Sequence, residues 1–181
     1  KINFEYVNTK NFEYSVNDLR YFVYLDYLKR NTNIQNIFMT DGNDVTVVNS
    51  PFNKFEKTCV GQDADDNGNN IYTSHPYIKK QLSIFNNNKN WSYKFNENKN
   101  IKFYSAGILG GNRRQIVFFL ENMVKIFNDM NQEQKRKNLN MLVFNYVIYH
   151  MLNEDVISGA PLCSRFKKYE NHRKDVCFIH K

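Results

Sequence analysis

The sequence has few of the features that would place it in several common protein classes. Its three cysteines lack the CxxC spacing of a metal site and the even number of a complete disulfide framework, so we expect them to be free and buried. No apolar run approaches the roughly 18 residues of a membrane-spanning helix, and no signal peptide is visible. The G-x-S-x-G motif of α/β-hydrolases is also missing. These absences disfavour disulfide-rich, membrane-spanning and serine-hydrolase classes.

The residues that are present favour one folded domain with a basic surface. The 181 residues include 15 Phe and 12 Tyr, and 41% are hydrophobic, which is enough for a buried core. We therefore expect a single domain over residues 1–181. The net charge of +7 favours anionic partners such as nucleotides, phosphates, acidic glycans or nucleic acid, although scattered lysines usually form only a solvated surface.

Hydrophobic periodicity predicts a mixture of strands and helices. Residues 15–18 form a capping box that begins a helix ending near Arg30. The other expected helices cover residues 75–85, 113–127 and 132–151. The expected strands cover residues 2–7, 37–40, 45–48, 101–109, 156–157 and 176–179, while residues 53–70 are interpreted as a loop. This order predicts an α/β fold with three α/β/α layers around a mixed, mostly parallel sheet.

Residues 37–48 place two carboxylates in a turn between two short strands. Asp41 and Asp44 follow the first strand, and Gly42 and Asn43 favour the turn. Ligands of open α/β sheets bind beyond the carboxyl ends of the strands, and paired carboxylates suit Mg²⁺ or Mn²⁺ shared with substrate phosphates. A turn of the same residues would also form without any metal.

Two glycine-bearing stretches are weaker signals. Residues 105–112 are interpreted as a strand-to-helix junction, where glycines allow a ligand to approach the backbone and the helix N-terminus favours an anion. A tight turn would need the same glycines. Residues 61–68 are rich in Asp but lack the spacing of an EF-hand, so we interpret them as a solvated acidic loop.

Several blocks together resemble the GT-A class of nucleotide-sugar glycosyltransferases, and more closely a group with a D-x-x-D signature. The matching blocks are residues 17–21, 40–45, 50–52, 106–111, 140–146 and 179–181, in the family order. The resemblance implies a GT-A-like, Rossmann-like domain that transfers a sugar from a nucleoside-diphosphate donor, a UDP-sugar, to a glycan, protein or lipid acceptor. It also implies that a first strand precedes this sequence and that residues 2–7 are the second strand.

The resemblance assigns the metal site to three residues. Asp44 and His180 would be ligands of Mn²⁺ or Mg²⁺, and Asp41 would contact the metal or the ribose. The diphosphate of the donor would supply further ligands, and the metal would neutralise the charge of the departing nucleoside diphosphate. The alternative for His180 is a frayed residue near the chain end.

The resemblance also assigns residues to the donor. Arg20 would reach toward the donor, with a surface salt bridge as its alternative. The donor sugar would face the backbone of Gly107, Gly110 and Gly111. The diphosphate would lie near basic side chains, namely Lys181, Lys167, Lys168 and Arg165, for which a solvated basic face is the alternative.

The catalytic group is the least defined part of the sequence. Many members of the family carry an acidic residue at the position of Asn140, whose amide does not titrate. Asp155 and Glu154 are candidate general bases by position alone. Two alternatives therefore stay open: a catalytically degenerate GT-A-like domain that binds nucleotide or glycan, and a basic nucleic-acid-binding domain, for which no recognised motif is present. The compartment is equally open, either cytoplasmic or lumenal.

Overall fold

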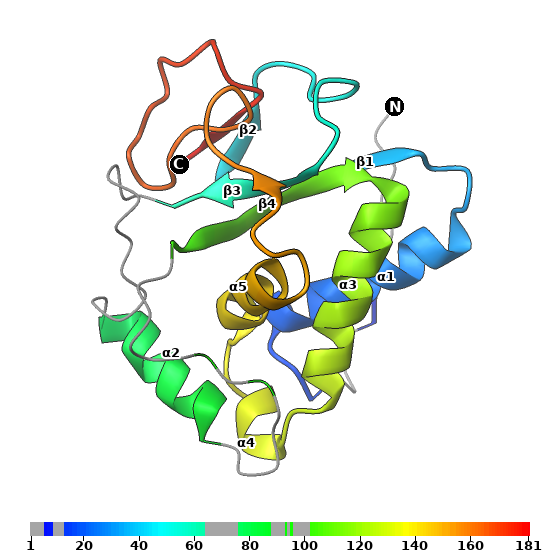
Figure 1. Cartoon of the computed structure of the whole chain (residues 1–181), viewed down its shortest axis with the longest axis vertical. Helices are drawn as coiled ribbons and strands as arrows, with labels where there is room; N and C mark the ends of the chain where they lie inside the picture. Colours follow the sequence, from blue (N-terminus) through cyan, green and yellow to red (C-terminus); the bar gives the residue numbers. More distant parts are fainter. Residues whose placement is uncertain (1–5, 9–12, 64–75, 88–92, 94, 96–101) are drawn as a thin grey trace.

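The computed structural model describes residues 6–8, 13–63, 76–87, 93, 95 and 102–181. Within these residues the chain alternates between helices and strands (Figure 1). The elements are α1 (Val16–Arg30), β1 (Asn36–Thr40), β2 (Val45–Val47), β3 (Thr58–Gln62), α2 (Pro76–Asn86), β4 (Tyr104–Asn112), α3 (Arg113–Asn128), α4 (Gln132–Lys135), α5 (Asn140–His150), β5 (Val156–Ile157) and β6 (Phe178–His180).

A mixed sheet with the strand order β1-β4-β3-β5 forms the centre of the fold. The long strand β4 pairs antiparallel with both β1 and β3, and only the short pair β3–β5 is parallel. A second, two-stranded sheet joins β2 and β6, also antiparallel. The α/β fold and the mixed sheet are confirmed, but the prediction of a mostly parallel sheet is wrong. Periodicity locates strands without showing which strands pair, or in which direction.

The two faces of the central sheet are covered differently. Helices α1, α3 and α5 pack on one face (Figure 1), and Leu109 of β4 and Phe119 of α3 both belong to the main core. On the other face, Ile108 packs against Cys163 and Phe178 of the C-terminal segment. In the described part of the chain, loops and the β2–β6 pair therefore stand where the sequence predicted a second helical layer. The three cysteines are free and buried, as expected.

Local signals in the sequence set where two helices begin. The side chain of Ser15 accepts a hydrogen bond from the backbone N–H of Asp18 at the start of α1. The side chain of Asn112 does the same for Gln115 at the start of α3. Both predicted caps are confirmed, because each oxygen satisfies an N–H group that has no partner within its own helix.

Three predicted elements differ from the structure. Residues 58–62 form the buried strand β3 rather than a loop, because a strand covered on both faces need not alternate in hydropathy. The helix predicted over residues 132–151 is two helices, since residues 135–138 offer no apolar side chain to pack. Gly110 and Gly111 lie inside β4 and not in a junction. Of the strand predicted at residues 2–7, only residues 6 and 7 are described, and they are not in a strand.

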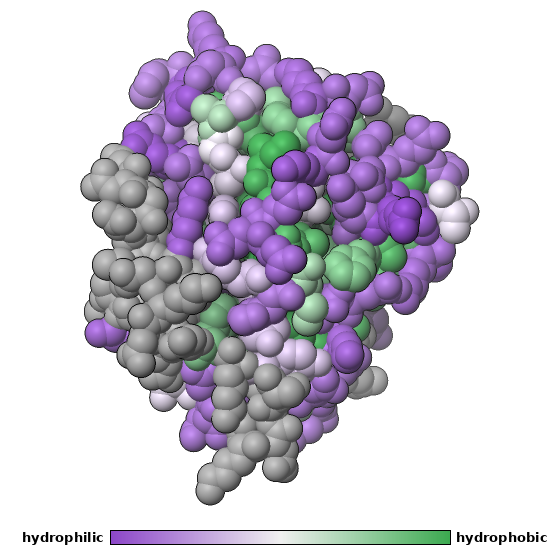
Figure 2. Space-filling view, viewed as in Figure 1, coloured by the Kyte–Doolittle hydropathy of each residue, from purple (hydrophilic) through white to green (hydrophobic). Residues whose placement is uncertain are grey.

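The surface of the described chain is mainly polar. Polar side chains cover most of the face shown in Figure 2, with apolar side chains visible in smaller areas between them. No helix among the described residues has both the length and the apolar character that crossing a membrane requires.

Candidate metal centre

Strand β1 places Asp41 at the edge of the central sheet. Thr40, the last residue of β1, pairs with Ile108 of β4. The backbone N–H of Asp41 then donates to the carbonyl oxygen of Gly107 at 3.0 Å. Asp41 is therefore held by the ladder itself, and its carboxylate emerges where the chain leaves the sheet.

The β2–β6 pair brings the end of the chain to the same place. Val45 lies opposite His180 in this antiparallel pair. The backbone N–H of Lys181 donates to the carbonyl oxygen of Asp44 at 2.8 Å. The pairing thus fixes His180 and Asp44 as neighbours, although residues 45–179 separate them in sequence.

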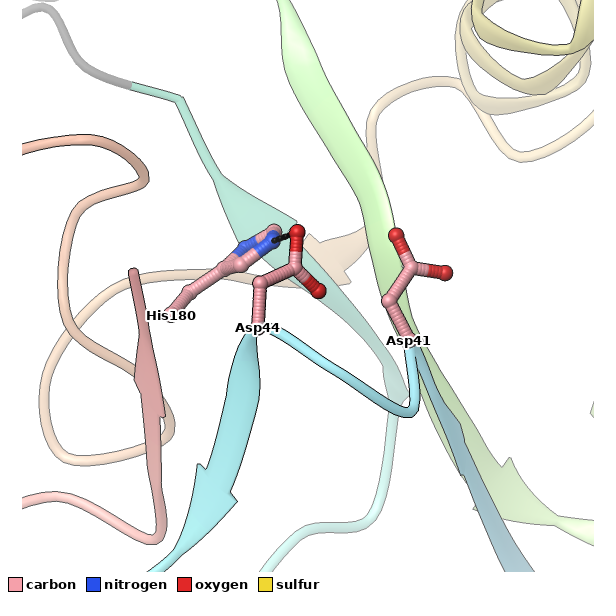
Figure 3. Close-up of side chains that lie close together, drawn as sticks. All are labelled: Asp41, Asp44 and His180. Carbon is pink, nitrogen blue, oxygen red and sulfur yellow. Dashed lines mark ion pairs between the residues drawn. The ribbon is translucent and has the colours of Figure 1, made fainter.

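Asp41, Asp44 and His180 form one cluster (Figure 3). A carboxylate oxygen of each Asp and a ring nitrogen of His180 all lie within 4.8 Å of one another. Nε2 of His180 is 3.9 Å from Oδ2 of Asp44. The imidazole is 1% exposed, whereas the Asp41 and Asp44 side chains are 33% and 41% exposed. The cluster has a buried nitrogen at its base and carboxylates that solvent can reach.

The buried atoms of this cluster fit a bound cation. Among the described residues, neither ring nitrogen of His180 has a hydrogen-bond partner, and Oδ1 of Asp44 also lacks one. Leaving buried polar atoms unpaired costs stability, which a ligand can recover. Burial lowers the pKa of His180 against the opposing effect of the nearby carboxylates. The imidazole is therefore neutral near pH 7, which is the form that binds metals.

The surroundings of His180 hold its ring in place. The ring of Phe166 packs against it with centroids 4.2 Å apart, and the hydroxyl of Ser164 accepts a hydrogen bond from the His180 backbone at 2.8 Å. A methyl group added at Gly107 would lie 2.6 Å from Nε2 of His180. The absence of a side chain at Gly107 therefore makes room for the imidazole. Neither Phe166 nor Ser164 belongs to a recognisable motif, so no sequence pattern predicts their role.

Arg20 reaches the cluster from α1. Its Nη1 forms an ion pair with Oδ1 of Asp41, while Nη2 donates to the hydroxyl of Tyr21 at 3.0 Å and to the carbonyl of Ala106 at 3.3 Å. The guanidinium is thus engaged by the protein and orients Asp41. The structure shows the salt bridge that was the alternative for Arg20, and its contact with a donor stays a prediction.

Two of the three predicted glycines lie away from the cluster. Gly110 and Gly111 face Phe38 and Ile37 in the β1–β4 ladder, farther from Asp41 than Gly107 is. A methyl group at Gly110 would collide with the ring of Phe38. Of the three glycines predicted to face the donor sugar, the structure therefore brings only Gly107 to the cluster.

Of the two candidate catalytic residues, Asp155 lies apart from the cluster, whereas Asn140 is linked to Asp41 through Tyr21 and Arg20. Asn140 is 6% exposed at the start of α5, and its side chain hydrogen-bonds the Tyr21 hydroxyl. Asp155 forms an exposed ion pair with Lys57, just before Thr58 begins β3. The metal cluster lies toward the other end of this strand, where the backbone N–H of Phe166, whose ring packs on His180, donates to the carbonyl of Gln62. Near that end, Asp63 follows β3 and acts electrostatically on His180.

The predicted basic residues divide into two groups. Arg165 donates to the carboxylate of Glu170 through its side chain and its backbone N–H. Lys167, Lys168 and Lys181 are exposed. The carboxylate of Glu170 therefore engages Arg165, and the three lysines are available to an anion.

Comparisons with known proteins were made by family and by sequence. No protein-family model matches this chain, and no curated protein sequence matches it.

Proposed function

We propose that this protein is a metal-dependent glycosyltransferase that moves a sugar from a UDP-sugar to a glycan, protein or lipid acceptor. The observation that carries the proposal is the imidazole of His180. It is buried, both its nitrogens lack hydrogen-bond partners among the described residues, and two carboxylates adjoin it. Such an arrangement suits a divalent cation shared with substrate phosphates.

The residues of the cluster would hold Mn²⁺ or Mg²⁺ together. Asp44 and His180 would be the direct ligands, and Asp41 would add an oxygen to the cation or a contact to the ribose. When bound, the cation neutralises negative charge on the departing nucleoside diphosphate. Arg20 keeps Asp41 oriented through its ion pair. Lys181, next to His180 and paired through its backbone with Asp44, offers an exposed ammonium group to the diphosphate.

A second candidate function is nucleotide or glycan binding without transfer. The placement of Asn140 favours it, because this buried amide cannot act as a base and already bonds Tyr21. The distance of Asp155 from the cluster favours it too. The two functions share the metal cluster and differ only in whether the donor is cleaved.

Release of UDP from a panel of UDP-sugars tests the proposal. With Mn²⁺ we expect the protein to release UDP from at least one donor, and we expect EDTA to stop this reaction. The rate should fall at least about 100-fold in Asp44→Ala, since losing even an indirect contact to a metal lowers affinity or activity by 10- to 100-fold. Asp26→Ala is the matched control, because Asp26 is exposed on α1 and its ion pair among the described residues is with Arg30, at 2.9 Å.

Two outcomes would contradict sugar transfer. If no donor is cleaved although UDP binds with Mn²⁺, the non-catalytic function replaces it. If Asp44→Ala and Asp26→Ala cleave the donor equally well, the cluster is not the site of the reaction.

A further inference from the structure

The loop of residues 165–170 is closed on itself beside the metal cluster. The carboxylate of Glu170 accepts hydrogen bonds from the backbone N–H of Arg165 at 3.0 Å and from its Nε at 2.9 Å. Arg173 adds an ion pair to Glu170 at 3.6 Å. Glu170 is only 8% exposed, so this clamp joins the two ends of the loop in a partly dry environment.

The same loop is attached to the cluster through Phe166. The backbone N–H of Phe166 donates to the carbonyl of Gln62 at 3.0 Å, which ties the loop to the end of β3. Its ring packs against the imidazole of His180. The loop is therefore positioned with respect to the metal cluster.

The tip of this loop, residues 167–169, has a strained backbone. Lys167 and Tyr169 have φ values of +58° and +52°, in the left-handed region that is unfavourable for bulky residues. Such conformations persist where the surrounding structure imposes them, and they are concentrated at functional sites. The clamp between Arg165 and Glu170 supplies that constraint here.

The tip presents two ammonium groups and an aromatic ring to solvent. Lys167 and Lys168 are exposed, and within the described residues neither forms an ion pair. The ammonium of Lys167 lies over the Phe166 ring, 5.0 Å from its centroid. The Tyr169 side chain is 71% exposed, which is unusual for so large a ring on a fixed loop.

We propose that residues 167–169 bind an acidic acceptor, meaning a glycan that carries phosphate, sulfate or carboxylate groups. This inference rests on the proposed sugar transfer. The lysines would pair with the anionic group, and the ring of Tyr169 would pack against the sugar. Lys167 of the tip lies over the ring of Phe166, which packs against His180, whereas the backbone of Lys181 bonds Asp44 directly. Lys181 therefore serves the donor diphosphate, and the tip serves an anion on the second substrate.

A charge-neutral double variant tests this site. Lys167→Gln with Lys168→Gln removes both charges, and Lys79→Gln with Lys80→Gln is the matched control, because these adjacent lysines are exposed on α2. An array of acidic and neutral glycans identifies a bound glycan, whose dissociation constant is then measured at two salt concentrations. We expect acidic glycans to be preferred, to bind more weakly at high salt, and to lose at least about tenfold in affinity in the loop variant only.

Tyr169→Asn examines the ring separately. Asn tolerates positive φ better than Tyr, so this variant removes the ring without adding strain to the loop. We expect weaker binding of the same glycan in Tyr169→Asn and near-normal binding in Tyr169→Phe. Binding of Tyr169→Asn at the level of the original protein would remove the ring from the proposed site.

Parallel titrations with UDP and Mn²⁺ separate this inference from the proposed function. We expect the loop variant to bind UDP with Mn²⁺ normally, and Asp44→Ala to lose that binding while keeping the glycan. If the loop variant loses UDP instead, the lysines serve the donor and the inference is wrong. It is also wrong if no acidic glycan binds, or if both lysine pairs have equal effects. If the original protein binds the acidic glycan but does not bind UDP with Mn²⁺, the result contradicts the proposed sugar transfer and still supports the glycan site.

Discussion

At the scale of single residues, the metal cluster depends on a glycine, because a side chain at position 107 would occupy the space of the imidazole. Gly107 lies directly beneath the imidazole of His180, and it is also opposite Asp41 in the sheet. The approach of the imidazole requires glycine, because a Cβ at this position would lie 2.3 Å from Cε1 of His180. The affinity of the cluster for a cation should therefore be sensitive to one methyl group that is not itself a ligand.

Gly107→Ala is expected to weaken Mn²⁺ binding by about 10- to 100-fold, the usual cost of disturbing the support of a metal ligand. The added methyl would lie 2.6 Å from Nε2 of His180 and 3.1 Å from Oδ2 of Asp41, so the imidazole must move. Titration of Mn²⁺ followed by electron paramagnetic resonance measures the change. Gly42→Ala is the control, because a methyl there has nothing within 4 Å. Equal affinities in Gly107→Ala and the original protein would show that the imidazole is not a ligand.

At this scale, the sequence predicted cluster residues only where metal-binding side chains stand close together in one local pattern. Asp41 and Asp44 stand in one turn, so their pairing was visible without a structure. His180 was found only through a family resemblance, because its place beside Asp44 results from the β2–β6 pairing. Phe166 supports His180 from another loop, and no local pattern marks it.

At the scale of elements, a buried carboxylate lies between two helices. Asp18 on α1 is fully buried and accepts a hydrogen bond from the Ser15 hydroxyl at 2.8 Å. Burial raises the pKa of Asp18 to about 7, against the opposing effects of Ser15 and of the backbone amides of Leu139 and Asn140. Those amides stand at the start of α5. Asp18 thus lies where α1 meets the start of α5, and its Oδ1 has no hydrogen-bond partner among the described residues.

This carboxylate should make stability depend on pH. Its pKa is about 7 in the folded chain, against 3.8 as the reference for the unfolded chain. Between these values the folded state binds more protons, so the contribution of Asp18 is full below about pH 4 and falls as the pH rises to 7. At about 1.4 kcal/mol per pKa unit, the change is on the order of a few kcal/mol.

Asp18→Asn removes this titration. The original protein should lose stability as Asp18 ionises, and Asp18→Asn should not. We therefore expect Asp18→Asn to become more stable relative to the original protein as the pH rises from 5 to 8. Urea unfolding at several pH values measures the difference, with Asp26→Asn as an exposed control on the same helix. If the stability curves of Asp18→Asn and the original protein run parallel across this range, Asp18 does not titrate there.

The elements themselves show where reading the sequence succeeds and fails. Helices α1 and α3 were predicted with their caps, because capping is a local hydrogen bond between neighbouring residues. Strand β3 was missed, although it lies inside the sheet. Its buried run is short and contains Gly61, and its neighbours β4 and β5 come much later in the chain. Partners distant in sequence leave no trace in local periodicity.

At the scale of the whole molecule, the C-terminal segment completes both the fold and the site. It covers the face of the central sheet opposite α1, α3 and α5 (Figure 1), and it supplies β6 with His180. The same segment forms the basic loop of residues 165–170. The cluster therefore joins the turn between β1 and β2 to the C-terminal segment, so cation binding should stabilise these two parts of the fold together.

Thermal unfolding with UDP and Mn²⁺ tests the central claim most directly. At about 100 times the dissociation constant, a ligand stabilises the folded state by about 2.7 kcal/mol, which in a chain of this size raises Tm by roughly 5–10 °C. We predict that this rise requires UDP and Mn²⁺ together, disappears in Asp44→Ala and persists in Asp26→Ala. An unchanged Tm with both ligands present, or an equal rise in Asp44→Ala, would contradict a nucleotide-sugar site at Asp41, Asp44 and His180.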